Sequence, residues 1–298
     1  MAGATSPTLP LGICLPNSDW IRAKHGSKSV NLANVHNARG ESESDLKNEF
    51  FFDMYQDGIK EYGSMSGSLH TDLHEVAGHG SCQSLEGVSN EQLDIYYSVI
   101  EEARADLVGL YFINRPELID FGILDSDVDL ELFGNTQYVS YITNGALLQL
   151  RRVELGSNLA QPHLRNRQLI SNWVLEKAQE SKCVELVTVS GKTYVVLNDF
   201  DKLRDLFGEL LGEIQRIKST GDYKAAKAIV EQYGTLVDYD KHEQILNRVE
   251  SINPPSLYGF TTPIYTTVLN DEGEVIDYEV HQKDSFIEDQ LFLSKHYS

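Results

Sequence analysis

The sequence predicts a mainly helical (α+β) fold that carries two small β-hairpins. Three observations support this class: long segments with apolar residues at helical spacing, two pairs of short alternating segments around turn residues, and an ordinary globular composition. Of the 298 residues, 41% are hydrophobic and 23% are charged, which allows a substantial core. We expect residues 1–298 to form a single catalytic region, with residues 1–10 as a flexible lead-in.

The predicted helices follow one another along most of the chain. An amphipathic helix is expected at 48–62, and a turn-rich loop of glycine and serine at 63–68 should lead into the next helix. A long helix begins near Ser89 or Asn90 and stops before Pro116, because proline disfavours the helical conformation in front of it. The remaining helices are predicted at 136–154, 162–181, 199–219, 222–233, 241–249 and 284–296.

The two hairpins are predicted from residues that alternate along short segments on either side of a turn. Segments 184–189 and 193–197 flank Ser190 and Gly191, and segments 264–269 and 275–280 flank a turn at 271–273. Glycine and small polar residues are typical of such turns. We find no internal repeat.

Charge and cysteine content exclude some classes of partner. A net charge of -20 argues against nucleic acid and anionic membranes as partners. No apolar run approaches the roughly 18 residues of a membrane span, and residues 1–7 lack the features of a signal peptide. Cys14, Cys82 and Cys183 stand at unpatterned spacing, which favours reduced thiols. We therefore expect a cytoplasmic protein.

The segment that suggests a metal site is LHEVAGH at 73–79. The imidazoles of His74 and His79, together with one carboxylate from elsewhere in the chain, can supply three ligands to zinc and leave the fourth position open for water. Glu75 would then be the base beside that water. His74 and His79 are five residues apart, which places them about 140° apart on an ideal α-helix. One widened turn of the π type restores a common face, and Gly78 makes that turn easier. We expect a distorted turn at 76–78.

A second segment, EEARAD at 101–106, offers the third ligand. Glu102 is the predicted ligand, and Glu101 could accept the second N–H of a ligand histidine. Asp106 stands one helical turn after Glu102. The alternative is that these acids are solvated, as paired carboxylates in helices usually are. The apolar stripe of this helix is predicted to comprise Ile95, Val99, Ala103, Leu107 and Leu110.

Two further side chains could take part in a metal site. His70 and His74 form an i, i+4 pair that could bind metal on an undistorted helix. We instead expect His70 to lie in the preceding turn and to donate to a carboxylate such as Asp72 or Glu101. Cys82 follows His79 closely, but Glu102 completes a better-attested set of two histidines and one glutamate.

Together the two motifs resemble those of dipeptidyl peptidase III, a family of zinc exopeptidases that release dipeptides from peptide N-termini. The pattern HExxGH at 74–79 is followed by EExxxD at 101–106, and the flanks LPNSDWIR at 15–22, HGSKSV at 25–30 and HLRNRQ at 163–168 are similar to the family's catalytic half. The resemblance implies one zinc ion per chain, held by His74, His79 and Glu102, with Glu75 as the catalytic base.

The same resemblance assigns supporting roles to other residues. Glu101 and Asp106 become outer carboxylates, and His163 lies near the transition state. Arg167 stands one turn after His163 on the helix that Pro162 begins, and it is expected to support the site from outside. Short peptides are the implied substrates.

Members of this family resemble two lobes that flank a cleft. This chain is expected to correspond to the helical zinc-peptidase lobe, without the N-terminal half that carries most of a β-barrel lobe and a tyrosine that aids the transition state. A separate N-terminal lobe or a partner chain would then be needed to complete the cleft.

The sequence thus predicts a zinc-dependent exopeptidase of the dipeptidyl-peptidase type. Two alternatives stay open. The first is a zinc-binding but catalytically weak or silent half-protein that acts as a binding or regulatory module. The second is a structural fragment that keeps its metal helix only for folding.

Overall fold

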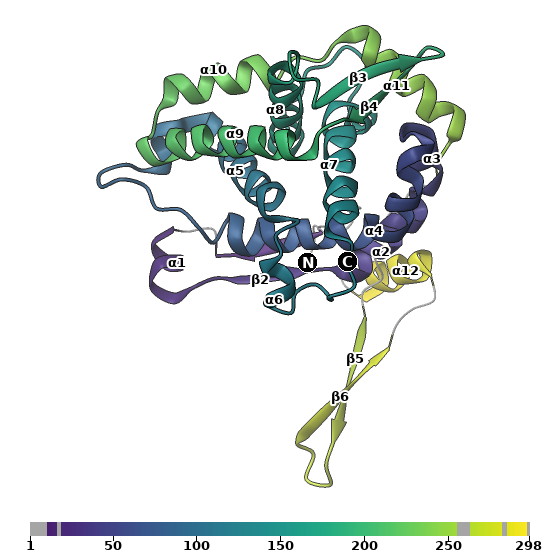
Figure 1. The fold of residues 1–298 in the computed structure, drawn as a ribbon. Coiled ribbons are helices and arrows are strands. Elements are labelled where there is room, and N and C mark those ends of the chain that lie inside the picture. Colours follow the sequence, from purple (N-terminus) through teal and green to yellow (C-terminus); the bar gives the residue numbers. More distant parts are fainter. Residues whose placement is uncertain (1–10, 17–18, 255–262, 282–284, 297–298) are drawn as a thin grey trace. The chain divides into compact units, whose positions relative to one another are not determined.

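The computed structural model describes residues 11–16, 19–254, 263–281 and 285–296, and it confirms a mainly helical fold (Figure 1). The chain separates into two compact units, of which the larger spans Leu11–Pro255 and the other contains Ser256–Ser298. The predicted lead-in at 1–10 lies outside the described residues. That residues 1–298 act as a single catalytic region stays a prediction.

The larger unit consists of helices packed around one apolar core, with two short strand pairs. Its elements, in chain order, are β1 (Gly12–Leu15), α1 (Asp19–His25), β2 (Lys28–Asn31), α2 (Ala33–Ser42), α3 (Ser44–Phe50), α4 (Asp53–Asp72), η1 (Leu73–Gly78), η2 (Asn90–Tyr96), α5 (Tyr97–Phe112), α6 (Glu117–Asp120), α7 (Leu130–Ala146), η3 (Leu148–Arg152), α8 (Pro162–Lys177), β3 (Val184–Val189), β4 (Lys192–Leu197), α9 (Phe200–Thr220), α10 (Tyr223–Tyr233) and α11 (Tyr239–Ile252).

Helix α5 is the central element of this unit. It packs against η1, α8 and α9, so that residues on several of its faces are buried. The predicted stripe is confirmed except for Ile95, which is 67% exposed. Ile95 precedes α5 in the 3₁₀ helix η2, where Asp94 adopts a φ of 48° and kinks the chain. The predicted helix start at residue 89 or 90 therefore belongs to a separate element.

The predicted helix at 48–62 has the wrong bounds, and the predicted loop at 63–68 is wrong. Helix α3 ends at Phe50, and α4 then runs without interruption from Asp53 to Asp72. Two small residues of α4 instead serve helix packing. Gly58 lies against Thr136 of α7, and Ser66 is fully buried. Tertiary contacts of this kind override the weak helix propensity of glycine and serine.

The later helices match the predictions apart from their ends. Helix α7 begins at Leu130, because Asp129 caps it by accepting from the backbone N–H groups of Glu131 and Leu132. It ends at Ala146, and the predicted continuation to 154 is a 3₁₀ helix, η3. Helix α8 begins at Pro162 as predicted, but it ends at Lys177.

Both predicted hairpins are confirmed, and a third strand pair accompanies them in the described part of the chain. Strands β3 and β4 pair in antiparallel register around Ser190 and Gly191, which both have positive φ. In the second unit, β5 (Ile264–Leu269) pairs with β6 (Val275–His281), and α12 (Phe286–His296) follows. Asp284, the predicted start of that helix, lies outside the described residues.

The additional strand pair lies beside the metal motif. β1 pairs with β2, and both strands contact η1. Each strand has four residues, which is too short for alternation to be a clear signal. Among the described helices, none combines the length and the apolar character that a membrane crossing would need.

Candidate metal centre

The first motif contains the predicted distortion. Residues Leu73–Gly78 form a π-helix directly after α4, and the backbone N–H of His79 donates to the carbonyl of His74 at 2.8 Å. The two imidazole rings consequently lie on one face, with centroids 4.6 Å apart. Gly78 is required for a second reason, because a Cβ at this position would stand 2.7 Å from the Cα of Ala105 on α5.

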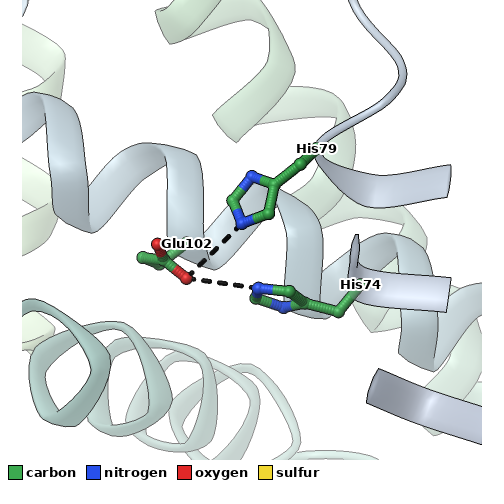
Figure 2. Close-up of side chains that lie close together, drawn as sticks. All are labelled: His74, His79 and Glu102. Atoms are coloured by element: carbon green, nitrogen blue, oxygen red, sulfur yellow. Dashed lines mark ion pairs between the residues drawn. The ribbon is translucent and has the colours of Figure 1, made fainter. Parts of the chain in front are cut away.

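Both rings point toward the carboxylate of Glu102, which α5 supplies (Figure 2). Oε2 of Glu102 lies 3.3 Å from Nε2 of His74 and 3.9 Å from Nε2 of His79. Ligand atoms bound to zinc at 2.0–2.2 Å in a tetrahedron are about 3.4 Å apart, so the arrangement fits such an ion. Glu102 Oε2 is also buried without a hydrogen-bond partner among the described residues, as a ligand atom would be.

The charge of Glu102 is favoured by the histidines around it. Burial on its own would raise the pKa of Glu102, but His163 and His74 outweigh it and lower the pKa to about 2. His163, at the start of α8, places Nδ1 3.1 Å from Oε2 of Glu102, and its side chain is 48% exposed. The structure therefore brings His163 to the three predicted ligands.

A buried carboxylate orients His74. Nδ1 of His74 lies 2.7 Å from Oδ1 of Asp106, while Oδ2 of Asp106 accepts from the Tyr141 hydroxyl and the Asn166 amide, each at 2.7 Å. Burial would raise the pKa of Asp106, but the charge and hydrogen bond of His74 hold it well below its usual range. In turn, burial opposes the charge of His74, yet Asp106 and Glu102 raise its pKa to about 10.

A second carboxylate orients His79. Nδ1 of His79 lies 2.9 Å from Oε1 of Glu101, the contact that the sequence predicted for this residue. Glu101 also accepts from Arg104, and Nζ of Lys218 on α9 lies 2.5 Å from Oε2. Burial would raise the pKa of Glu101, but the hydrogen bonds from His79 and Arg104 lower it far below its usual value.

The backbone around His79 is held from two sides. Arg104 donates to the carbonyl of Gly78 at 2.6 Å and to the hydroxyl of Ser81 at 3.0 Å. Arg22 donates to the carbonyl of His79 at 3.1 Å. The turn that carries this ring is thus attached both to α5 and to the segment between β1 and β2.

Glu75 lies on the strand side of the motif. It is half-buried, and a Cβ at Gly12 of β1 would stand 2.8 Å from its Oε1. Its backbone carbonyl accepts from the Ser29 hydroxyl at 3.4 Å. Glu75 does not belong to the group of converging ligand atoms, which consists of His74, His79 and Glu102. Its role as a base stays a prediction.

Arg167 lies half-buried on α8, one turn after His163. Its charge contributes to the lowered pKa of Asp106 and opposes the protonation of His70. Arg167 thus lies beside the outer carboxylate, as an outer residue would, and its functional role stays a prediction.

The expectation for His70 is wrong in its details. His70 belongs to the continuous helix α4 rather than to a preceding turn, and its Nε2 lies 3.2 Å from the backbone carbonyl of Asp106 instead of contacting Asp72 or Glu101. Burial lowers the pKa of His70 to about 4. The ring is a neutral packing residue behind the site and is not among the converging ligand atoms.

Cys82 is likewise outside the ligand group. Its Sγ accepts from the amide of Gln215 at 2.6 Å, and its backbone φ is 85°. Cys14, Cys82 and Cys183 are all free thiols, of which Cys14 and Cys183 are buried.

Several residues of the site were missed by sequence reasoning. Tyr141 and Asn166 give no signal in the sequence, because only the packing of α7 and α8 against α5 brings them to Asp106. Arg104 lies inside the second motif, and its position three residues after Glu101 and two after Glu102 was a signal that it could contact one of them. Lys218 directly follows Ile217 in the buried stripe of α9, and a lysine at such a position is a signal for a buried partner.

Comparison with known proteins gives matches over most of the chain. The model of peptidase family M49 matches residues 2–98 and 90–284. The chain is 28% identical to dipeptidyl peptidase 3 of Mus musculus over 271 residues, covering 77% of this chain and 36% of the relative. It is 27% identical to dipeptidyl peptidase 3 of Homo sapiens, with the same coverage. It is also 27% identical to Nudix hydrolase 3 of Arabidopsis thaliana, covering 86% of this chain and 31% of the relative.

Solved structures show the same fold. The structure of DPP III from Caldithrix abyssi superimposes with a TM-score of 0.61 at 24% identity, covering 81% of this chain and 42% of that one. Dipeptidyl-peptidase III from Corallococcus sp. strain EGB gives a TM-score of 0.64 at 20% identity, covering 85% and 43%. The chain thus spans well under half of these relatives. The family resemblance that the two motifs suggested is confirmed, and the chain belongs to peptidase family M49.

Proposed function

We propose that this chain is the zinc-binding catalytic part of a peptidase that releases dipeptides from the N-termini of short peptides. The observation that carries the proposal is the convergence of two imidazole nitrogens on a buried carboxylate oxygen that has no hydrogen-bond partner among the described residues. Membership of family M49 and the similarity to dipeptidyl peptidase 3 support the substrate class.

In this proposal His74, His79 and Glu102 hold one zinc ion per chain. Each ring donates Nδ1–H to a carboxylate, so that in the neutral ring the lone pair of Nε2 is available for the metal. When bound, zinc would lower the pKa of water to about 7 and polarise a peptide carbonyl. Glu101 and Asp106 stay ionised and keep the two rings in their binding tautomer.

The remaining steps belong to the chain's own side chains. Glu75 accepts a proton from the attacking water and passes it to the leaving amine. His163, beside Glu102 and half-exposed, donates a hydrogen bond to the oxyanion that develops on the scissile carbonyl. Arg167 adds positive charge beside Asp106. The free cysteines support a reducing, cytoplasmic location as part of the proposal.

The test compares the purified chain with its Glu75→Gln variant. We expect about one zinc per chain by elemental analysis of both proteins, and release of a dipeptide from a dipeptidyl-arylamide by the wild type only. Hydrolysis that persists in Glu75→Gln would exclude this residue as the base. Zinc binding without any hydrolysis by the wild type would instead favour a silent binding module.

A folding role for the metal needs its own measurement. If zinc served only to fold the chain, a chelator should lower the melting temperature sharply. We expect a modest shift, since the larger unit has an extensive apolar core that does not depend on the site.

A further inference from the structure

Lys218 is a buried cation of the site that the proposed mechanism does not use. It lies near the end of α9, and only 6% of its surface is exposed. Its Nζ is 2.5 Å from Oε2 of Glu101, whose side chain is 8% exposed. Burial of a lysine is tolerated only where its charge is paired, so the contact with Glu101 is what stabilises Lys218 in this position.

Lys218 and Arg104 hold the same carboxylate from different helices. Arg104 stands on α5 with Glu101 and donates to Oε2 at 3.0 Å and to Oε1 at 2.8 Å. Because Arg104 and Glu101 both belong to α5, their contact does not fix Glu101 relative to any other helix. Lys218 comes from α9, which packs along α5 (Figure 1). Its contact therefore fixes the Oε2 side of Glu101 against a second helix.

We infer that Lys218 is a positioning residue for the metal site, acting through Glu101 on His79. With Oε2 held by two cations, Oε1 remains placed to accept Nδ1–H of His79 at 2.9 Å. That hydrogen bond directs Nε2 of the same ring toward Glu102. The inference rests on the proposed function, since it concerns a metal bound at this Nε2.

The same end of α9 also supports the chain that follows His79. The backbone N–H of Leu85 donates to the carbonyl of Ser219 at 3.0 Å, and Gln215 donates to Cys82. Lys218 thus stands between two contacts that anchor residues 82–85 to α9. This placement supports a role for Lys218 in fixing the position of the His79 side chain relative to α9.

If Lys218 acted through its charge alone, its removal would strengthen zinc binding. Glu101, Glu102 and Asp106 bring negative charge to the site, and loss of a neighbouring cation would make it more attractive to a divalent ion. A positioning role predicts weaker binding, because losing an outer partner typically costs about 10–100-fold in metal affinity. The direction of the change separates the two roles.

The experiment measures zinc affinity by competition with a chromophoric chelator. The variants are Lys218→Met, Lys218→Arg and, as a matched control, Lys202→Met, which removes a 61% exposed lysine of the same helix. We expect about 10–100-fold weaker zinc binding in Lys218→Met, little change in Lys202→Met, and substantial recovery in Lys218→Arg. The visible spectrum of bound Co²⁺ should change only in Lys218→Met, because it reports the ligand geometry.

Three outcomes would overturn the inference. Lys218→Met that binds zinc as tightly as the wild type, or more tightly, would show that Lys218 does not position the ligand. A lowered melting temperature of the metal-free variant with unchanged zinc affinity would show a purely structural contact between α5 and α9. Equal losses in Lys218→Met alone and in a Glu101→Gln background would show that Lys218 does not act through Glu101.

Two further cases keep the test decisive. If Lys218→Met does not fold, Lys218→Gln removes the charge but keeps a donor, and the same comparison of zinc affinity applies to it. A wild-type chain that binds no zinc would refute the proposed function itself, whereas normal wild-type binding with an unaffected Lys218 variant refutes only the positioning role.

Discussion

His74 and His79, the two proposed ligand histidines, are oriented by carboxylates with different surroundings. Asp106, behind His74, accepts from the neutral donors Tyr141 and Asn166, whereas Glu101, behind His79, is contacted by cationic groups. Burial opposes the charge of His74, but Asp106 and Glu102 raise its pKa to about 10 in the metal-free chain.

The neighbouring acids Glu101 and Glu102 should differ sharply when each loses its charge. Glu102→Gln removes a direct ligand, so stoichiometric zinc should be lost. Glu101→Gln removes a support of His79, and zinc affinity should fall by about 10–100-fold. Equilibrium dialysis against buffered zinc measures both. Retention of zinc in Glu102→Gln together with complete loss in Glu101→Gln would mean that their roles are exchanged.

The protonation of His74 makes zinc binding dependent on pH. Its pKa is raised to about 10 in the folded, metal-free chain, so the metal must displace a proton from the ring throughout the neutral range. Zinc affinity should therefore rise with pH, by up to about tenfold per unit between pH 7 and 9. Competition titrations at several pH values measure the slope, and an affinity independent of pH would contradict it.

The raised pKa of His74 also makes the stability of the metal-free chain fall as pH rises, whereas zinc affinity increases. A raised folded pKa contributes stability that is fully present below the unfolded value of about 6.5 and is lost as pH rises through about 10. The metal-free chain should thus lose this contribution between those values. The zinc-bound chain does not depend on a protonated His74, so its melting temperature should fall less over the same range.

The convergence of His74, His79 and Glu102 could be predicted from the sequence, since spacing and residue type carry that information. Glu101 was also predicted as the outer partner of a ligand histidine, but the residues that hold Glu101 and Asp106 in place could not be predicted. Lys218 and Asn166 reach Glu101 and Asp106 only because α9 and α8 pack against α5, and no local pattern encodes such a contact. The partner of His70 was mistaken for the same reason.

At the scale of elements, the junction of α4 and η1 depends on which glycines lie at helix contacts. Gly78 has no room for a side chain, because a Cβ would stand 2.7 Å from the Cα of Ala105, whereas a Cβ at Gly67 of α4 would meet nothing within 4 Å. Gly78→Ala should destabilise the fold by about 1–3 kcal/mol and displace His79. Gly67→Ala should stabilise it by up to about 1 kcal/mol.

Urea denaturation of the two metal-free variants measures this difference. The pair is matched, because both changes add one methyl group within the same continuous helical segment of α4 and η1. Equal stabilities would show that η1 does not approach α5 as closely as the structure has it. A destabilised Gly67→Ala would support the loop that the sequence predicted at 63–68.

Element types were predictable where apolar periodicity was strong, as in α9, and where turn residues separated alternating segments, as in β3 and β4. The errors concentrate in α4, where glycine and serine suggested a loop. Ser66 of that segment is fully buried inside the continuous helix, and Gly58, before the segment, permits the close approach of α7. The π-turn was predictable because the spacing of His74 and His79 demands it if both bind the same metal ion.

At the scale of the whole molecule, the site assembles from α5 and the helices packed around it. η1 supplies His74, and His79 directly follows it, while α5 supplies the carboxylates, α8 His163 and α9 Lys218. The fold class followed from composition and periodicity. The mutual arrangement of these helices did not, because it depends on packing between segments far apart in the sequence.

The central claim is that His74, His79 and Glu102 bind one zinc ion. A crystal structure of the chain grown with zinc, with anomalous data collected on both sides of the zinc absorption edge, tests it most directly. We predict one strong peak about 2.0–2.1 Å from Nε2 of both histidines and about 2.0–2.2 Å from the Glu102 carboxylate. A peak between His70 and His74, a peak at Cys82, or no peak among these side chains would contradict the account.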